Sequence, residues 1–151
     1  MRPKLLKKAA LALLLIIIVS VIGAYLAFTF SELGGAKIAY NYGNYGRAID
    51  STTKVIDDDK SPKRKRLSAL TLRGKTWFAQ KSYQEAIDDF SHAIEIGEEL
   101  ISSSQRVTKQ DVLELIDAYN GRAGVYIAKK DFETCLKDQK RAMQLLQTLK
   151  K

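Results

Sequence analysis

The chain lacks the residues that stabilise small disulfide-rich domains or build metal clusters. It contains one cysteine, Cys135, and one histidine, His92. A lone cysteine forms no internal disulfide, and one cysteine with one histidine does not supply the ligands of a structural zinc site. We therefore predict no metal and no cofactor, with Cys135 packed as a small buried residue and His92 near the surface.

Acidic residues are missing from the first 30 residues, and this gap explains much of the overall charge of +8. A second basic excess is the cluster Lys63, Arg64, Lys65 and Arg66 after Pro62. Outside these two segments the charges balance, which excludes the broad basic surface of a nucleic-acid-binding protein. We predict that 61–66 is a solvated loop; contact with anionic lipid or an acidic partner is the alternative.

A long uncharged stretch runs from Ala9 to Phe30. Its 22 residues would span roughly 33 Å as a helix, close to the ~30 Å hydrocarbon core of a bilayer. The apolar region of a cleavable signal peptide, the alternative, is shorter, at about 7–15 residues. We expect an uncleaved signal anchor at 9–30 that places the chain in the lipid bilayer.

The flanks of this stretch predict its orientation. Arg2, Lys4, Lys7 and Lys8 precede it. Positive charge resists translocation. We therefore expect a basic cytoplasmic tail at 1–8, a single-pass inner (plasma) membrane location, and residues 31–151 on the periplasmic or extracytoplasmic side.

Small and aromatic residues recur with the same steps three times after residue 31. The steps of 4, 3, 6, 3, 4 and 3 connect Leu70, Gly74, Trp77, Tyr83, Ala86, Phe90 and Ala93, then Tyr119, Ala123, Tyr126, Phe132, Cys135, Gln139 and Ala142, and more weakly Glu32, Ala36, Ala39, Tyr45, Ala48, Thr52 and Val55. Steps of 3 and 4 follow one face of a helix, and the step of 6 crosses a turn. Each unit is thus predicted to be a pair of antiparallel helices.

These units resemble tetratricopeptide (TPR) repeats, whose period is about 34 residues. The resemblance implies an all-α chain in which three hairpins, at approximately 29–62, 67–100 and 116–149, form a short right-handed α-solenoid. A generic amphipathic helical bundle is the alternative. The equivalent residues Ala48, Ala86 and Cys135 lie further apart than the repeat period. We place the excess in 61–66 and in a longer helix followed by a serine-rich loop at 98–110, with Thr108 or Gln110–Asp111 starting the next helix.

The same resemblance implies which residues pack the repeats and which bind a partner. The packing residues are Gly74, Trp77, Tyr83, Ala86, Phe90, Ala93, Ala123, Tyr126, Phe132, Cys135 and Ala142. The first helices of the units would line a concave groove for a protein or peptide, through Lys37, Tyr40, Asn41, Thr71, Lys75, Phe78, Asn120, Gly124 and Ile127. Asp117 and Ser68 stand where a clamp for a C-terminal carboxylate would need positive charge, so that mode of binding is not indicated.

The last helix is predicted to turn a polar face outward, as the end of a repeat array needs. Its inward residues would be Cys135, Gln139, Ala142, Leu146 and Leu149, and its outward residues Lys137, Asp138, Arg141, Gln144 and Thr148. The array would then end with this helix, without an additional capping helix.

Signals of catalysis are weak. Ser51-Thr52-Thr53-Lys54 matches an S-x-x-K pattern without its companion motifs. Asp57–Asp59 lacks the spacing of a calcium loop, and Gly34-Gly35, which follows no strand, is assigned to the junction after the anchor. We predict a non-enzymatic, membrane-anchored scaffold or tether outside the cytoplasm; the alternative is a cytosol-facing import or assembly receptor with the same anchor and repeats.

Overall fold

The computed structural model describes the backbone of residues 3–29, 31–103 and 107–149 and, within the first helix, the side chains of 12–27. These residues form helices and no strand. The helices are α1 (Pro3–Thr29), α2 (Glu32–Asn41), α3 (Tyr45–Asp57), α4 (Lys63–Ala79), α5 (Tyr83–Ser103), α6 (Lys109–Ala128) and α7 (Phe132–Thr148). Part of the predicted serine-rich loop, 104–106, lies outside the described residues.

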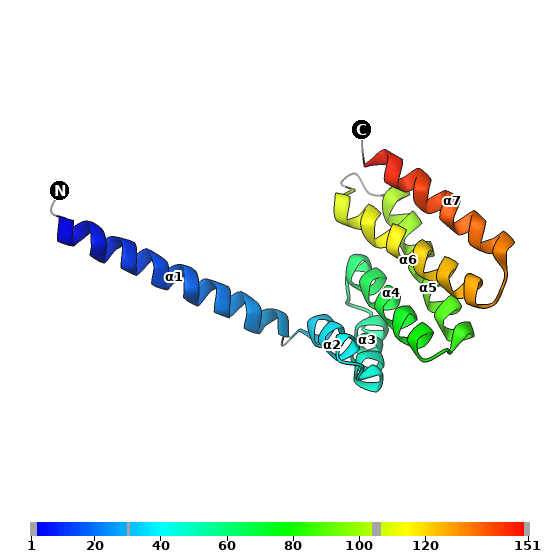
Figure 1. The fold of residues 1–151 in the computed structure, drawn as a ribbon, viewed down its shortest axis with the longest axis horizontal. Coiled ribbons are helices and arrows are strands. Elements are labelled where there is room, and N and C mark those ends of the chain that lie inside the picture. The colour runs from blue at the N-terminus through cyan, green and yellow to red at the C-terminus, as the bar shows by residue number, and fades with distance from the viewer. Residues whose placement is uncertain (1–2, 30, 104–106, 150–151) are drawn as a thin grey trace.

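Helix α1 extends away from the remaining helices as a separate stalk (Figure 1). Its described side chains are exposed, including Tyr25 at 66%. Taken singly, no helix among the described residues meets the length and hydropathy needed to cross a bilayer. One pair of segments has the required length and hydropathy when the two are taken together, Ala12–Ala27 and Glu32–Asn41, and this pair is bent by 82°. The basic side chains predicted for the cytoplasmic tail lie outside the described side chains.

Helices α2 to α7 pair as three successive hairpins, α2–α3, α4–α5 and α6–α7, as the spacing of small and aromatic residues predicts. Each hairpin turns through one residue in the left-handed region, Gly43, Lys81 or Lys130, with φ of 73°, 63° and 63°. The amide of the following residue donates to a carbonyl five residues earlier in every case: Asn44 to Ala39 at 2.8 Å, Ser82 to Trp77 at 3.0 Å and Asp131 to Tyr126 at 2.9 Å. The first hairpin, weakest in sequence, thus has the same turn as the others.

The helices pack closely where a glycine on one helix leaves room for a large side chain of another. Phe90 is fully buried. A Cβ on Gly121 would lie 2.4 Å from its ring and one on Gly74 would lie 3.0 Å from it. The main core joins the second and third hairpins through Leu67, Leu70, Ile94, Val112, Leu115 and Leu145, among others. Of the predicted packing residues, Gly74, Ala86, Phe90, Ala93, Ala123, Cys135 and Ala142 are buried, and Trp77, Tyr83 and Tyr126 are half-buried.

Phe132 differs from its predicted packing role, since it is 61% exposed. The prediction for the faces of α7 is also wrong in part. Asp138 and Leu145 are buried, whereas Gln139 and Leu146 are exposed. The buried face is therefore turned by about one residue from the expected one, because Asp138 is drawn inward by Arg122.

Two further segments differ from the prediction. Lys63–Arg66 is not a loop but the first turn of α4, which begins after Pro62. Gly34 and Gly35 lie inside α2 rather than in a flexible junction. The start of α6 is confirmed: Thr108 is its N-cap and forms a reciprocal capping box with Asp111.

Candidate functional site

The first helices of the hairpins, α2, α4 and α6, together form a pocket of about 360 Å³. All nine residues predicted to line the groove lie on these three helices. Three of them, Lys37, Thr71 and Lys75, line this pocket. The pocket also contains residues that the groove prediction did not include: Ser31, Leu33, Gly34, Lys65, Ser68, Leu72, Glu114 and Asp117.

The other six predicted residues lie outside this pocket. Phe78 packs near Tyr83, with ring centroids 6.0 Å apart, and a Cβ on Gly124 would be 3.5 Å from the Phe78 ring. Tyr40 is half-buried near Tyr45. Asn41, Asn120 and Ile127 are exposed. Phe78 and Gly124 thus contribute to the contact between α4 and α6 rather than to the lining of the pocket.

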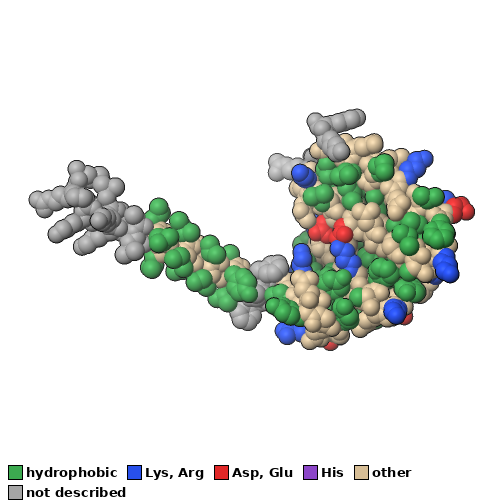
Figure 2. Space-filling view, viewed as in Figure 1, with side chains coloured by type: hydrophobic (Ala, Val, Ile, Leu, Met, Phe, Trp, Pro, Cys, Tyr) green, Lys and Arg blue, Asp and Glu red, His purple; other side chains and the backbone are tan. Residues whose placement is uncertain are grey.

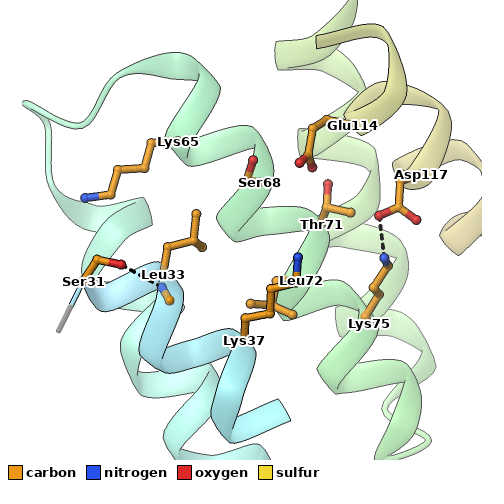
Figure 3. A pocket seen from close by; sticks show the side chains of 11 residues that line it. Ser31, Leu33, Lys37, Lys65, Ser68, Thr71, Leu72, Lys75, Glu114 and Asp117 are labelled. Atoms are coloured by element: carbon orange, nitrogen blue, oxygen red, sulfur yellow. Dashed lines mark hydrogen bonds and ion pairs between the residues drawn. The ribbon is translucent and has the colours of Figure 1, made fainter. Parts of the chain in front are cut away.

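Charges of opposite sign face each other across the pocket. Lys75 on α4 forms an ion pair with Asp117 on α6 (Figure 3). Glu114, one turn before Asp117, accepts a hydrogen bond from the side-chain amide of Gln110 at 3.0 Å. In the described part of the chain, Lys37 and Lys65 form no ion pair. Within the part of the chain that the structure describes, the pocket therefore offers two ammonium groups without an ion pair on its α2 and α4 side and one carboxylate without an ion pair on α6.

The lining of the pocket includes apolar side chains as well as charged ones. Leu33 and Leu72 contribute apolar side chains from α2 and α4. Thr71 is buried, and its hydroxyl donates to the Leu67 carbonyl at 2.9 Å, so that proton is committed within the helix. Figure 2 shows acidic and basic side chains next to one another on this face of the molecule. Such a surface suits a segment that combines apolar and charged side chains.

The cluster Lys63–Arg66 is divided between internal contacts and the pocket. Lys63 pairs with Glu99, and Arg64 donates to both oxygens of Asp111, at 2.6 and 3.0 Å. Arg64 thereby holds the pKa of Asp111 below its ordinary value. Arg66 lies on the opposite side of α4, with a buried Nε that has no hydrogen-bond partner among the described residues. Only Lys65 reaches the pocket, so the cluster is not one continuous basic patch.

Two buried ion pairs recur at equivalent places in the second and third hairpins. Arg73 donates to both oxygens of Asp89 at 2.8 Å, and Arg122 to both oxygens of Asp138 at 2.7 and 2.9 Å. Each arginine also reaches back to the preceding hairpin. Arg73 donates to the Thr53 hydroxyl and Arg122 to the Ser91 hydroxyl, both at 2.9 Å. These contacts fix the spacing of the helices that carry the pocket.

The pattern of helix faces does not predict these pairs, because each pair joins residues on the two helices of a hairpin, on either side of its turn. The signal was present: an arginine is followed 16 residues later by an aspartate in both units. At the equivalent positions the first unit has Gly35 and Ser51, so it lacks the pair.

One similar protein supports the repeat assignment. The chain is 29% identical over 114 residues to Hsp70-Hsp90 organizing protein 3 of Arabidopsis thaliana, a match that covers 74% of this chain and 19% of the relative. The chain thus spans about a fifth of that relative's length. No protein-family model and no solved structure matches the chain. The hairpin geometry and this distant similarity together support TPR-like helical repeats.

Proposed function

We propose that the chain is a non-catalytic scaffold whose pocket between α2, α4 and α6 binds a segment of another protein. The observation that carries this proposal is the convergence of three successive first helices on one hollow that is lined, among the described residues, by unpaired charges and apolar side chains. The similarity to an organizing protein, whose name describes assembly of other proteins, supports the same class of function.

The partner segment is expected to present an acceptor to Lys37 and an apolar side chain to Leu33 and Leu72. Lys37 is exposed and unpaired among the described residues, so a carboxylate or carbonyl can approach it without breaking an existing ion pair. Lys75 is less available because Asp117 already neutralises it. Lys37 is thus the better position for a test.

Photo-crosslinking in cells tests the pocket. A photoreactive residue replacing Leu72 in the pocket should give a discrete adduct that the same residue replacing Glu95, on the other side of the molecule, does not give. Lys37→Glu should remove that adduct, whereas Lys60→Glu, an equal charge change in the turn between α3 and α4, should leave it. An adduct that survives Lys37→Glu and also forms at Glu95 would refute the pocket as the binding site.

The second part of the proposal concerns location: α1 acts as a single-pass anchor and holds the repeats outside the cytoplasm. The uncharged run from Ala9 to Phe30, its basic N-terminal flank and the exposure of the side chains from 12 to 27 support this. Anchoring would confine scaffold and partner to one surface and raise their effective concentration.

Reporter fusions after Lys151 test the location. Activity of an exported phosphatase in that fusion, together with retention of the chain in carbonate-washed membranes, is the expected result. Activity of a cytosol-only reporter would favour the receptor on the cytosolic side. Release into the carbonate wash would refute the anchor while leaving the crosslinking result unaffected.

A further inference from the structure

Helix α7 has a row of exposed apolar side chains along the face that points away from the other helices. This α7 stripe consists of Phe132, Leu136, Met143 and Leu146, which are 61%, 64%, 62% and 43% exposed. Spacings of 4, 7 and 3 keep them on one side of the helix, over roughly 21 Å at about 1.5 Å per residue. The outer helix of a repeat array is ordinarily polar, so this surface needs an explanation.

The repeat itself shows what usually covers such a stripe. The residues of α5 equivalent to Leu136, Met143 and Leu146, 49 positions earlier, are Ile87, Ile94 and Gly97. Ile94 is only 8% exposed because α6 lies over it, and a Cβ on Gly97 would lie 2.7 Å from Leu115 of α6.

Helix α3 is covered in the same way, by α4. Its equivalents Ile49 and Ile56 are half-buried, and Ile56 packs against the core to which Leu67 and Leu70 of α4 belong. In both inner hairpins the covering element is a helix. The α7 stripe therefore corresponds to a surface on which one more helix would pack, and no described part of the chain covers it.

One position beside the α7 stripe indicates which charge the covering helix should present there. On α3 the residue is Thr53 and on α5 it is Ser91, and each accepts a hydrogen bond at 2.9 Å from an arginine of the covering helix. The equivalent residue on α7 is Lys140, which is exposed. An arginine on the covering helix would here meet a lysine and be repelled, whereas a carboxylate would form an ion pair.

The unpaired charges around the stripe are mostly basic, since the carboxylate of Asp131 caps α7 through Thr134. Lys129 and Lys130 lie just before α7 and are exposed. Glu133 is the exposed acid of the first turn, and Lys137 already pairs with it at 2.8 Å. A second copy of this chain would bring Lys140 and these lysines towards an identical lysine-rich rim, and its own α4 and α6 carry arginines at the critical position.

We propose that the outer face of α7 is a docking site for an amphipathic helix of a partner protein, with an acidic residue opposite Lys140. This site is separate from the pocket between α2, α4 and α6, and it does not depend on the function proposed for that pocket.

Binding of two model helices to the full chain in phosphatidylcholine nanodiscs tests the site. The peptides share one leucine and alanine face; one has a glutamate rim and the other a lysine rim. At 0.15 M salt, fluorescence anisotropy should show binding of the glutamate peptide alone. Lys140→Glu should weaken this binding on the order of tenfold and strengthen binding of the lysine peptide.

Matched variants separate the α7 stripe from general attraction to a basic protein. Leu136→Gln with Met143→Gln should abolish binding without changing the urea midpoint, since both side chains are exposed. Lys60→Glu makes the same charge change as Lys140→Glu, but at a position that is not on α7. It should have no effect on binding of either peptide. Equal binding of the glutamate peptide to all variants, or no binding at all, would overturn the proposal.

Two other occupants would also overturn it. If the α7 stripe joined two copies of the chain, sedimentation equilibrium would show a dimer that Leu136→Gln dissociates. If it lay on lipid, phosphatidylserine in the nanodiscs would compete with the glutamate peptide. Neither effect is expected.

Discussion

Arg73 and Arg122 each connect three helices through one side chain. The arginine side chains are 19% exposed and those of their aspartate partners 7% and 5%. Removal of one member of such a pair leaves the other as an uncompensated buried charge. We therefore expect the pairs to specify how the hairpins sit on one another more than to add stability.

For Arg122→Ala we expect a loss of about 3–5 kcal/mol in the free energy of unfolding, because Asp138 stays buried without a partner. Urea denaturation followed by circular dichroism measures it. The double variant Arg122→Met with Asp138→Leu should recover most of the loss. Lys137→Ala, which breaks an exposed ion pair on the same helix, should leave the free energy of unfolding nearly unchanged. Equal effects of Arg122→Ala and Lys137→Ala would show that burial does not matter at Asp138.

Substitution of single glycines by alanine tests how closely the helices pack. Gly121→Ala should destabilise the protein by about 1–3 kcal/mol, because the new Cβ would lie 2.4 Å from the rigid ring of Phe90. Gly46→Ala, in α3 with no atom near its Cβ position, should instead stabilise by about 0.5–1 kcal/mol. Thermal unfolding of both variants measures the contrast, and two shifts of the same sign would contradict it.

At the scale of elements, the hairpins and their turns could be predicted because small and aromatic residues repeat with fixed steps. The faces of α7 could not be predicted in full. Asp138 lies inward, where Arg122 on another helix binds it. Helix periodicity describes one element at a time and carries no information about such a partner.

The basic cluster shows the same limit. The sequence predicts Lys63 and Arg64 in a solvated loop, whereas they pair with Glu99 and Asp111, which are 36 and 47 residues further along the chain. Pairings at that distance depend on how the hairpins stack. The sequence predicts the three helices of the pocket and three of its lining residues, Lys37, Thr71 and Lys75. It does not predict Leu33, Leu72 and Glu114, because their place in the lining depends on how neighbouring helices pack against one another.

The contacts of α4 with α6 and of α5 with α7 should make stability depend on acid. Arg64 lowers the pKa of Asp111 from 3.8, and Arg141 lowers that of Glu98 from 4.5. A carboxyl group whose pKa is lower in the folded state stabilises the fold above its unfolded pKa and loses this contribution as pH falls through the folded value. Stability should therefore fall below about pH 4.5 and continue to fall under pH 3.8.

Urea titrations from pH 7 to pH 2.5 check this dependence. Arg64→Gln should reduce the loss on acidification, because Asp111 then titrates nearer its ordinary pKa in the folded protein. Arg141→Gln should do the same for Glu98. If both variants lost stability as steeply as the unaltered chain, the acid sensitivity would arise from other groups.

At the scale of the whole molecule, stalk and repeats are nearly independent. Helix α1 makes its contacts outside itself with α2. Residues 31–151 produced alone should accordingly be helical, with a urea midpoint equal to that of the full chain in nanodiscs. Circular dichroism and denaturation measure both. A strand-rich or unstructured product would refute the repeat fold, and a much lower midpoint would show that α1 stabilises the domain.

The missing arginine–aspartate pair in the first hairpin has a mechanical consequence. Gly35 and Ser51 occupy its positions, and α2 is the shortest helix described, with 10 residues. A pulling force transmitted along α1 would reach this hairpin first. The second and third hairpins, which contain the buried ion pairs, would resist unfolding. Uncoiling of 32–57 would release about 90 Å of chain at the ~3.3–3.6 Å per residue of an extended backbone. The stalk would thus lengthen under load and the pocket would lose its α2 side, while the fold of α4 to α7 and the outer face of α7 stay intact.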